Sequence, residues 1–369
     1  MKLTLDLPSG TSPDALRGYC LFYQLERWLR EMVYLELKAH FGENWWTEAE
    51  QALKRSRGGG IPAARSLRAD KRHPHMSTPE NDPLWFLSLD SLTKIILDKK
   101  LWRLFGSYLT TKSLVKAKFD EIAPIRNRIA HYRALHKDDI DRIVAVLRDI
   151  DEGFWRFCTS YNNNKWFVPP HTKDPVFEHF ADRQHRGMSK TSDGKWVGPV
   201  GILIGVDVNI ELLYSFRPSA RARKTRIGGH RGALYDFTFS AAHHHDGSRI
   251  LDYPRIISAT RHHHRSLIHI LLDSFQSRLR VTFPAVAPSG DIIQAAEAFY
   301  AACLHNRGGI YYRRSKKDAS PEESDLREYE ENLRPYELIA AEWPHYVVPP
   351  GNPFNFLGPD MPCRFFQAV

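Results

Sequence analysis

Cysteine is scarce in this 369-residue chain, and its four copies lie far apart. They are Cys20, Cys158, Cys303 and Cys363, and none belongs to a Cys-x-x-Cys pair. Disulfide frameworks and thiolate zinc sites both depend on closely spaced cysteines. The sequence therefore predicts neither a disulfide-stapled protein nor a thiolate zinc protein.

Long apolar runs are also missing. No stretch reaches the roughly 18 consecutive apolar residues that a membrane-spanning helix needs. The N-terminal segment MKLTLDLPSG lacks the basic start and the apolar run of a secretory signal. We therefore expect a cytoplasmic protein with no membrane partner.

Two common catalytic frameworks are absent as well. The glycine-rich segments SRGGG and NRGG are not followed by the Lys-Ser or Lys-Thr of a phosphate-binding loop, and no strand–helix frame surrounds them. No Ser-His-Asp arrangement stands out. These absences argue against a nucleotide-phosphate loop and against a Ser-His-Asp hydrolase, and we expect no cofactor.

Positive charge, by contrast, is in excess. The chain has 52 Lys and Arg against 43 Asp and Glu, which gives a net charge of +9. That balance favours a polyanionic partner such as RNA, although many basic proteins bind no nucleic acid. The chain is 42% hydrophobic and 26% charged, as is usual for globular proteins, and its length suggests two domains.

The N-terminal part has the periodicity of helices. Leu21, Leu25, Trp28 and Met32 recur at helical spacing and predict one amphipathic helix over residues 13–40. Similar spacing predicts further helices over residues 46–54, 84–99, 101–108, 111–135 and 138–161.

These segments predict an all-α helical bundle over residues 1–162. A basic loop rich in Gly, Pro, Arg and His is expected as an insertion at 55–83. This loop is expected to be an exposed connection between helices. The alternative is that its basic residues contact RNA.

A second domain begins after a shift in composition. The segment TSYNNNKWFVPPHTKDP, with its Asn run and paired prolines, marks a boundary. Beyond it, apolar runs separated by Gly and Pro predict strands, and other segments predict helices. The strands are expected over 196–214, 233–240 and 278–283, and the helices over 291–304 and 320–341. The fold class is therefore α+β, with a mixed α+β domain over 163–369 that ends in a Pro-rich surface tail.

One stretch, FDEIAPIRNRIAHYRAL from Phe119 to Leu135, combines chemistry with helical patterning. A helix turns about 100° per residue, so Asn127 and His131 share a face, and Arg126 lies roughly 140° from His131. An apolar stripe for the core is formed by Ile122, Ile125, Ile129 and Tyr132. A stripe of small residues, which permits close approach of another helix, is formed by Ala123, Asn127, Ala130 and Ala134.

Arg, Asn and His can supply the functions that metal-independent RNA cleavage requires. His titrates near neutrality, so it can remove the proton of the attacking 2′-hydroxyl or protonate the leaving oxygen. Arg presents a planar donor fork to phosphate, and Asn can orient the imidazole or donate to a phosphate oxygen. One helix supplies one of each, whereas two such helices packed around a two-fold axis supply two.

The segment RNRIAH, Arg126 to His131, resembles the Arg-Asn-x-x-x-His signature of HEPN-domain ribonucleases. An N-terminal helix carrying Glu26 and Arg30, which are spaced to pair, and the segment FGENWW extend the likeness over roughly the first 160 residues. The chain is most similar to HEPN proteins of bacterial abortive-infection and toxin–antitoxin type.

This resemblance implies a helical bundle, a homodimer formed through the motif helices, and cleavage that leaves a cyclic phosphate. It makes Arg126 and His131 catalytic, with Asn127 in support. The implied function is a metal-independent endoribonuclease of antiphage defence or toxin–antitoxin growth arrest. An RNA substrate and an antitoxin or regulatory partner are expected with it.

Further basic residues are candidates for RNA contact. Arg128 and Arg133 flank the motif, and SFRPSARARKTRIGGHRG is the densest basic stretch of the chain. The candidates within that stretch are Arg221, Arg223, Lys224 and Arg226. The alternative is that these side chains are solvated surface charges.

Two other functions remain open at this point. One is a non-catalytic HEPN module that binds RNA or dimerises. The other is a metal-dependent enzyme that uses the His-rich segments HHHD at 243–246 and HHH at 262–264, together with His269. Adjacent residues of a strand point to opposite faces, so a triplet cannot hold one ion from regular structure, and we expect no metal site.

Overall fold

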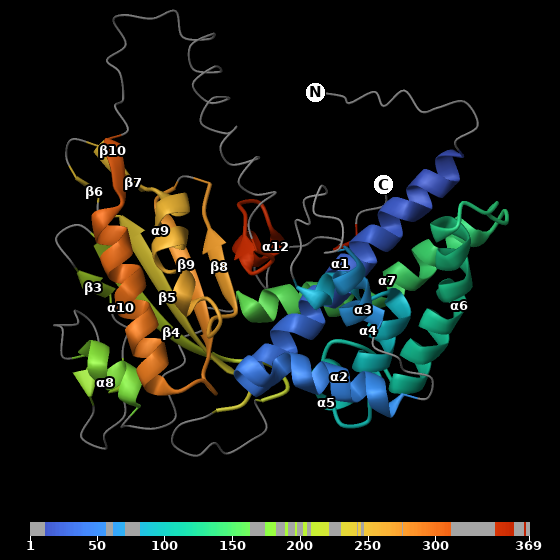
Figure 1. The fold of residues 1–369 in the computed structure, drawn as a ribbon, viewed down its shortest axis with the longest axis horizontal. Coiled ribbons are helices and arrows are strands. Elements are labelled where there is room, and N and C mark those ends of the chain that lie inside the picture. The colour runs from blue at the N-terminus through green and yellow to red at the C-terminus, as the bar shows by residue number, and fades with distance from the viewer. Residues whose placement is uncertain are drawn as a thin grey trace, which may run out of the picture.

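The structure is a computed structural model, and it has an α+β fold in which helices precede a mixed sheet (Figure 1). It describes residues 12–56, 62–70, 82–162, 174–181, 189–190, 196–197, 202–204, 208–220, 230–241, 243–244, 247–274, 276–310, 344–357 and 365–366. In that part of the chain, no helix combines the length and the apolar character required to cross a membrane.

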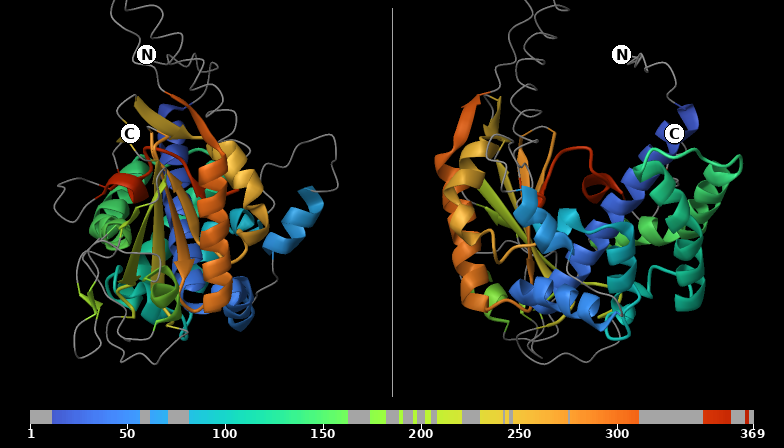
Figure 2. Two further views of the ribbon diagram at one scale, coloured as in Figure 1. Left: turned by 90° about the vertical axis from the view of Figure 1, so that its left-hand side faces the viewer. Right: turned by 45° about the vertical axis from the view of Figure 1, so that its right-hand side comes forward.

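The helical region is built around its first helix. Its elements are α1 (Pro13–Phe41), η1 (Gly42–Asn44), α2 (Trp45–Arg55), α3 (Pro62–Asp70), η2 (Pro83–Phe86), α4 (Leu89–Ile96), α5 (Trp102–Phe105), α6 (Lys112–Ala130) and α7 (Asp139–Tyr161). α1 begins at Pro13, where the Ser12 side chain accepts the Ala15 N–H, and every residue from 32 to 40 is buried. Burial on all sides follows because α1 lies between the other helices and the sheet (Figures 1 and 2).

The second region holds a six-stranded sheet in the order β11-β8-β9-β5-β4-β3, in which only the β11–β8 pair is parallel. Its strands are β3 (Ile202–Ile204), β4 (Val208–Phe216), β5 (Ala233–Ala241), β8 (His269–Leu272), β9 (Arg278–Pro284) and β11 (Val347–Val348). The short strands outside it are β1 (Ser189–Lys190), β2 (Trp196–Val197), β6 (His243–His244), β7 (Gly247–Leu251) and β10 (Arg307–Ile310). The helical elements here are α8 (Pro175–Ala181), α9 (Tyr253–Ala259), η3 (Arg261–His263), α10 (Ser289–His305) and α12 (Pro353–Phe356).

Strand β5 shows how the sheet is covered on both faces. Tyr235, Phe237 and Phe239 alternate along one face and share a hydrophobic cluster with Phe299 of α10. Leu234 belongs instead to the cluster that contains α1. Helices and sheet therefore share buried apolar contacts, and the division into two domains at residue 162 stays a prediction.

Several sequence predictions need correction. The expected basic loop at 55–83 contains helix α3, although residues 57–61 and 71–81 lie outside the described part. The helix expected over 84–99 is two elements, because Ser88 starts α4 by accepting the Ser91 N–H. The expected helix at 320–341 lies outside the described residues.

The prediction of a Pro-rich tail on the surface is also wrong in part, because some of this segment is buried. The segment after residue 344 adds β11 in parallel to β8 and forms the short helix α12. Phe354 of α12 is fully buried and packs against Trp28 and Phe157. Aromatic residues among the prolines therefore place this segment in the core, because their burial outweighs the extended preference of proline.

Candidate active site

The proposed motif lies on α6, and its arginine is held by the first helix. Arg126 Nε donates a hydrogen bond to Glu26 Oε1 at 2.9 Å, and Arg30 Nη2 donates to Glu26 Oε2 at 2.7 Å. The Arg126 side chain is 30% exposed, whereas those of Glu26 and Arg30 are 11% and 12% exposed. Arg126 is therefore the member of this trio that a ligand reaches most easily.

Glu26 is the carboxylate that both arginines of the trio share. Burial lowers the pKa of Arg30, Glu26 opposes that shift, and nearby Arg126 lowers the pKa further. Arg30 also donates to the Leu87 carbonyl at 2.8 Å. One carboxylate thus holds two guanidinium groups, of which Arg30 is tied to the bundle and Arg126 faces outward.

Asn127 and His131 lie in the last turn of α6, and both are exposed. The predicted helix end at Leu135 is wrong, because α6 ends at Ala130 and His131 is its C-cap residue. The His131 N–H still donates to the Asn127 carbonyl at 3.2 Å, so the two residues share this turn as predicted. Arg126 lies on the α1 side of the helix, so one chain does not gather all three side chains on one face.

Tyr132 was predicted to belong to the apolar stripe that faces the core, but it is 99% exposed because the helix ends before it. Its φ of +54° is a left-handed conformation that glycine commonly supplies at this position. Tyr132 N–H donates to the Ile129 carbonyl at 3.1 Å, and Arg133 N–H donates to the Arg128 carbonyl at 2.8 Å. These two bonds form a Schellman motif, which satisfies carbonyls at the end of α6.

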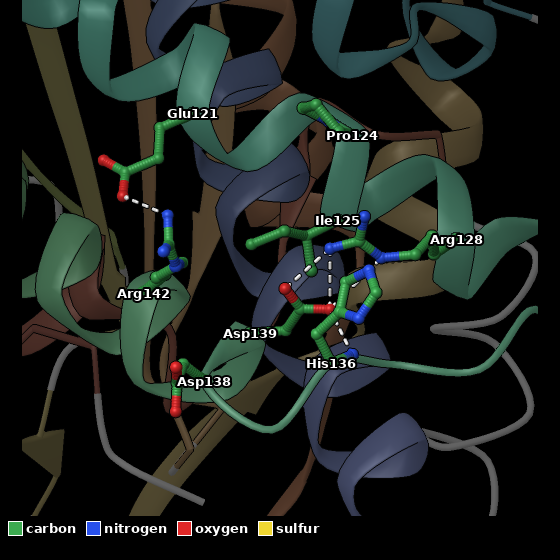
Figure 3. Close-up of a pocket in the computed structure, with 8 residues that line it drawn as sticks. All are labelled: Glu121, Pro124, Ile125, Arg128, His136, Asp138, Asp139 and Arg142. Carbon is green, nitrogen blue, oxygen red and sulfur yellow. Dashed lines mark hydrogen bonds and ion pairs between the residues drawn. The ribbon is translucent and has the colours of Figure 1, made fainter.

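A clamp between Arg128 and Asp139 closes the connection from α6 to α7 (Figure 3). Arg128 Nη2 donates to Asp139 Oδ1 at 2.6 Å, and the His136 N–H donates to Asp139 Oδ2 at 2.8 Å. Burial raises the pKa of Asp139, but the bonds from Arg128 and His136 outweigh it and hold the pKa below its usual value. The guanidinium of Arg128 is already engaged here, and its contact with RNA stays a prediction.

A cavity of about 350 Å³ lies beside this clamp. Its lining residues are Glu121, Pro124, Ile125, Arg128, His136, Asp138, Asp139 and Arg142 (Figure 3). Arg126, Asn127 and His131 do not line it. The cavity therefore lies between α6 and the start of α7, whereas Arg126 contacts Glu26 of α1.

An exposed apolar strip borders the motif. Leu16, Tyr19 and Tyr23 are all exposed, and the Tyr19 and Tyr23 rings stack with centroids 6.5 Å apart. Their spacing places them on the same face of α1 as Glu26, which reaches Arg126. Sequence reasoning missed this strip, although Leu16, Tyr19 and Tyr23 already have helical spacing.

The strip continues onto α6. Ala130 and Asn127 are exposed, and Ala123 is half-buried. We call the combined face of Leu16, Tyr19, Tyr23, Ala123 and Ala130 the α1–α6 surface. The two helices approach closely because Gly18 lies against Ile129, where an added Cβ would be 2.5 Å from Cδ1.

The dense basic stretch of the second region, SFRPSARARKTRIGGHRG, has a first arginine that is buried and not exposed. Arg221, Arg223, Lys224 and Arg226 lie outside the described residues. Arg217, at its start, is fully buried, and its Nε donates to Glu36 Oε1 at 2.7 Å. Burial alone would lower the pKa of Arg217, but Glu36 and Tyr108 raise it above its usual value. Arg217 therefore joins the sheet region to α1 rather than facing a ligand.

Two of the described histidines, His264 and His269, serve in packing. His264 is buried between Thr260 and Tyr346, and His269 is buried with its Nδ1 3.0 Å from the Tyr161 hydroxyl. Among the described residues, no group of three or more His, Cys, Asp or Glu is placed to hold a metal ion. His245 and Asp246 of the first segment lie outside that part of the chain.

Comparison with known proteins adds no assignment. No protein-family model, no curated protein and no solved structure matches the chain. The function therefore rests on the residues of the site and on the sequence motif.

Proposed function

We propose that the protein is a metal-independent endoribonuclease, active as a homodimer that joins two copies of the Arg126-Asn127-His131 motif. The observation that carries this proposal is the placement of Arg126. Glu26 orients it, yet it remains partly exposed beside the exposed face of α1 and α6. An oriented and accessible guanidinium group is well suited to phosphate recognition.

Dimerisation follows from the α1–α6 surface. Its exposed tyrosines offer apolar area for burial, and its alanines allow another helix to approach closely. Arg126 and His131 point to different sides of one helix, so they cannot meet within one chain, and a two-fold axis through this surface is the arrangement that would let Arg126 of one copy approach His131 of the other. The site is then complete only in the pair.

In the dimer, the motif residues divide the work of cleavage. One His131 accepts the proton of the attacking 2′-hydroxyl, and the second His131 protonates the leaving 5′-oxygen. Arg126 stabilises the charge that builds on the phosphoryl oxygens, and Asn127 donates to phosphate or orients His131. Cleavage leaves a 2′,3′-cyclic phosphate, and no step involves a metal.

The biological role that goes with this chemistry is growth arrest or antiphage defence in a bacterium. It rests on the resemblance of RNRIAH to HEPN toxins, and it implies an antitoxin or regulatory partner. The alternative is a non-catalytic HEPN module, in which the ion pair of Arg126 with Glu26 is only structural. The ribonuclease forms a cleavage product that depends on His131, whereas the non-catalytic module forms no product.

The test is RNA cleavage by the full chain in excess chelator, beside Arg126→Ala and His131→Ala. Each substitution is expected to reduce the rate at least ~100-fold. Lys116→Ala is the matched control, because Lys116 is an exposed cation on the same helix that pairs with Asp120. If both motif variants cleave like the unmodified protein, the site assignment is wrong.

A mixing experiment tests the composite dimer. Equal amounts of the Arg126→Ala and His131→Ala proteins are combined and allowed to exchange subunits. A mixed dimer keeps Arg126 on one chain and His131 on the other, so it should recover part of the cleavage that neither variant has alone, with one of the two proton transfers unassisted. No recovery, with mixed dimers verified by mass, would contradict a site in which Arg126 of one chain acts with His131 of the other.

A further inference from the structure

Tyr132 is the most exposed large hydrophobic residue of the described part of the chain, at 99% of its full accessibility. It also has φ +54°, a conformation that is disfavoured for a bulky residue. A glycine would end the helix without this strain. Strained residues persist where the surrounding structure holds them, and they cluster at functional sites.

The backbone of Tyr132 is held on both sides. The Schellman bonds from Tyr132 and Arg133 tie it to the last turn of α6. Downstream, Asp139 binds both the Arg128 side chain and the His136 N–H, which closes the connection to α7. The phenol ring therefore projects from a fixed point and not from a free loop.

The neighbours of Tyr132 suit a nucleic acid. It follows His131 directly, and the segment HYRALHK that contains both has no acidic residue. His131, Arg133 and His136 are all exposed. An aromatic ring beside the cations Arg133 and Lys137 is a combination that single-stranded nucleic acids contact, through base stacking and phosphate attraction.

We propose that Tyr132 is a base-stacking residue, and that it selects single-stranded RNA for cleavage by His131. An unpaired base next to the scissile phosphate stacks on the ring, while Arg133 contacts the backbone. A paired base is not available for such stacking, so duplex RNA is excluded. This inference rests on the proposed ribonuclease function and adds the class of substrate.

A second copy of the chain is a poorer occupant for this position. Tyr132 lies beyond the end of α6, whereas the exposed alanines and tyrosines of the α1–α6 surface lie on the helices themselves. Two segments rich in His, Arg and Lys would also repel each other across a two-fold axis. RNA carries the opposite charge.

The test compares three variants, Tyr132→Gly, Tyr132→Ala and Tyr132→Phe, with Leu114→Ala as control. Leu114 is another exposed apolar residue of α6, near its other end. Binding of a single-stranded oligonucleotide is measured in the His131→Ala background, so that the result does not depend on cleavage. Loss of the ring is expected to weaken binding ~10- to 100-fold, and Phe should restore it. Leu114→Ala should bind like the parent.

Two further measurements separate stacking from a structural role. Tyr132→Gly should raise the melting temperature because it relieves the strain at φ +54°, even as it weakens RNA binding. An abasic site in the oligonucleotide should weaken binding to the parent protein, and it should cause no further loss in Tyr132→Ala. The affinity for duplex RNA should be the same in Tyr132→Ala as in the parent protein.

The outcomes are distinct. If Tyr132→Ala binds the oligonucleotide like the parent protein, the stacking assignment is overturned. If Tyr132→Ala becomes monomeric, the assignment is also overturned, because Tyr132 would then be a dimer contact. If Tyr132→Ala weakens single-strand binding but His131→Ala still cleaves, the stacking stands and the catalytic assignment falls. If His131 is essential and Tyr132 is not, only the inference about Tyr132 fails.

Discussion

Glu26 and Arg126 lie 100 residues apart in the sequence, and their side chains are joined by a hydrogen bond of 2.9 Å. This bond connects α1 to α6 beside the α1–α6 surface. The same carboxylate accepts Arg30, which is anchored on the Leu87 carbonyl. The direction in which Arg126 points is therefore set from the centre of the helical region.

Glu26→Gln tests whether this orientation matters for cleavage. The amide keeps the size of the side chain but removes the charge that compensates Arg30 and Arg126. We expect a loss of about 1–3 kcal/mol in the free energy of unfolding, because a half-buried charged hydrogen bond is weakened. RNA cleavage should fall by more than the folded fraction does, since Arg126 is no longer held in place.

Urea unfolding at fixed protein concentration and cleavage rates in chelator measure the two effects. Asp120→Asn is the control, because Asp120 forms an exposed pair with Lys116 on the same helix. It should cost less than ~1 kcal/mol and leave cleavage intact. A destabilised Glu26→Gln protein that cleaves at the full rate would mean that Glu26 is only structural.

Asp139→Asn is expected to destabilise the connection between α6 and α7 in a pH-dependent way. The native pKa of Asp139 lies below its usual value, so its contribution is complete above the unfolded pKa and is lost as pH falls through the native pKa. At pH 7 the variant should be about 1–3 kcal/mol less stable, because Arg128 loses a charged partner.

Urea midpoints of both proteins at pH 7 and near pH 3 measure this difference, which should shrink in acid. Asp138→Asn is the matched control. Asp138 is the exposed neighbour of Asp139, and its side chain makes no capping bond to α7. If the gap between Asp139→Asn and the parent is the same at both pH values, the carboxylate does not act through its ionised form.

The features that sequence predicted correctly are those whose signals are local. The spacing of apolar residues predicted α1 and α7 almost to their ends, and apolar runs separated by Gly and Pro predicted β5 and β9. The pairing of Glu26 with Arg30 is confirmed, because a helix brings residues four apart together. Such patterns depend only on the geometry of one element.

The features that were missed depend on contacts between distant segments. Arg126 meets Glu26 only once α1 packs on α6. The helix end at Tyr132 lacks the glycine that normally marks it, so helical periodicity continued past the true end. Arg217 stands in a run that reads as a charged loop, and only the tertiary structure gives it a buried carboxylate.

His264 predicts a second pH dependence. Thr260 Oγ1 donates to the Ile256 carbonyl at 2.9 Å, so the same oxygen accepts the Nε2–H of His264, and Nδ1 accepts from the Tyr346 hydroxyl. Burial, with the nearby cation of Arg261, lowers the pKa of His264 to about 4. The native imidazole is therefore neutral at pH 7.

Because the native pKa is below the unfolded one, stability is full above pH ~6.5 and declines as pH falls toward ~4. The shift corresponds to a loss of roughly 3 kcal/mol over that window. His264→Gln should flatten the decline, whereas His262→Gln should not, since His262 is exposed. Urea unfolding between pH 7 and pH 4 measures the slopes, and equal slopes for all three proteins would contradict the assignment.

The buried pair of Glu36 and Arg217 predicts a strong coupling in stability. Both side chains are fully buried, and Arg217 Nη2 also donates to the Tyr108 hydroxyl at 2.9 Å. Arg217→Met should cost about 3–5 kcal/mol, because it leaves the Glu36 carboxylate buried without a cation. Adding Glu36→Gln should return part of that loss, so the double variant is more stable than the sum of the two single changes predicts.

A double-mutant cycle of urea unfolding measures the coupling, and RNA affinity is measured in parallel on folded protein. The affinity should not change with Arg217, because a fully buried guanidinium cannot reach a phosphate. If Arg217→Met weakens RNA binding while the protein stays folded, this arginine contributes to the RNA surface as its sequence context suggested. Additive losses in the cycle would instead show that the pair contributes no specific interaction between the sheet and α1.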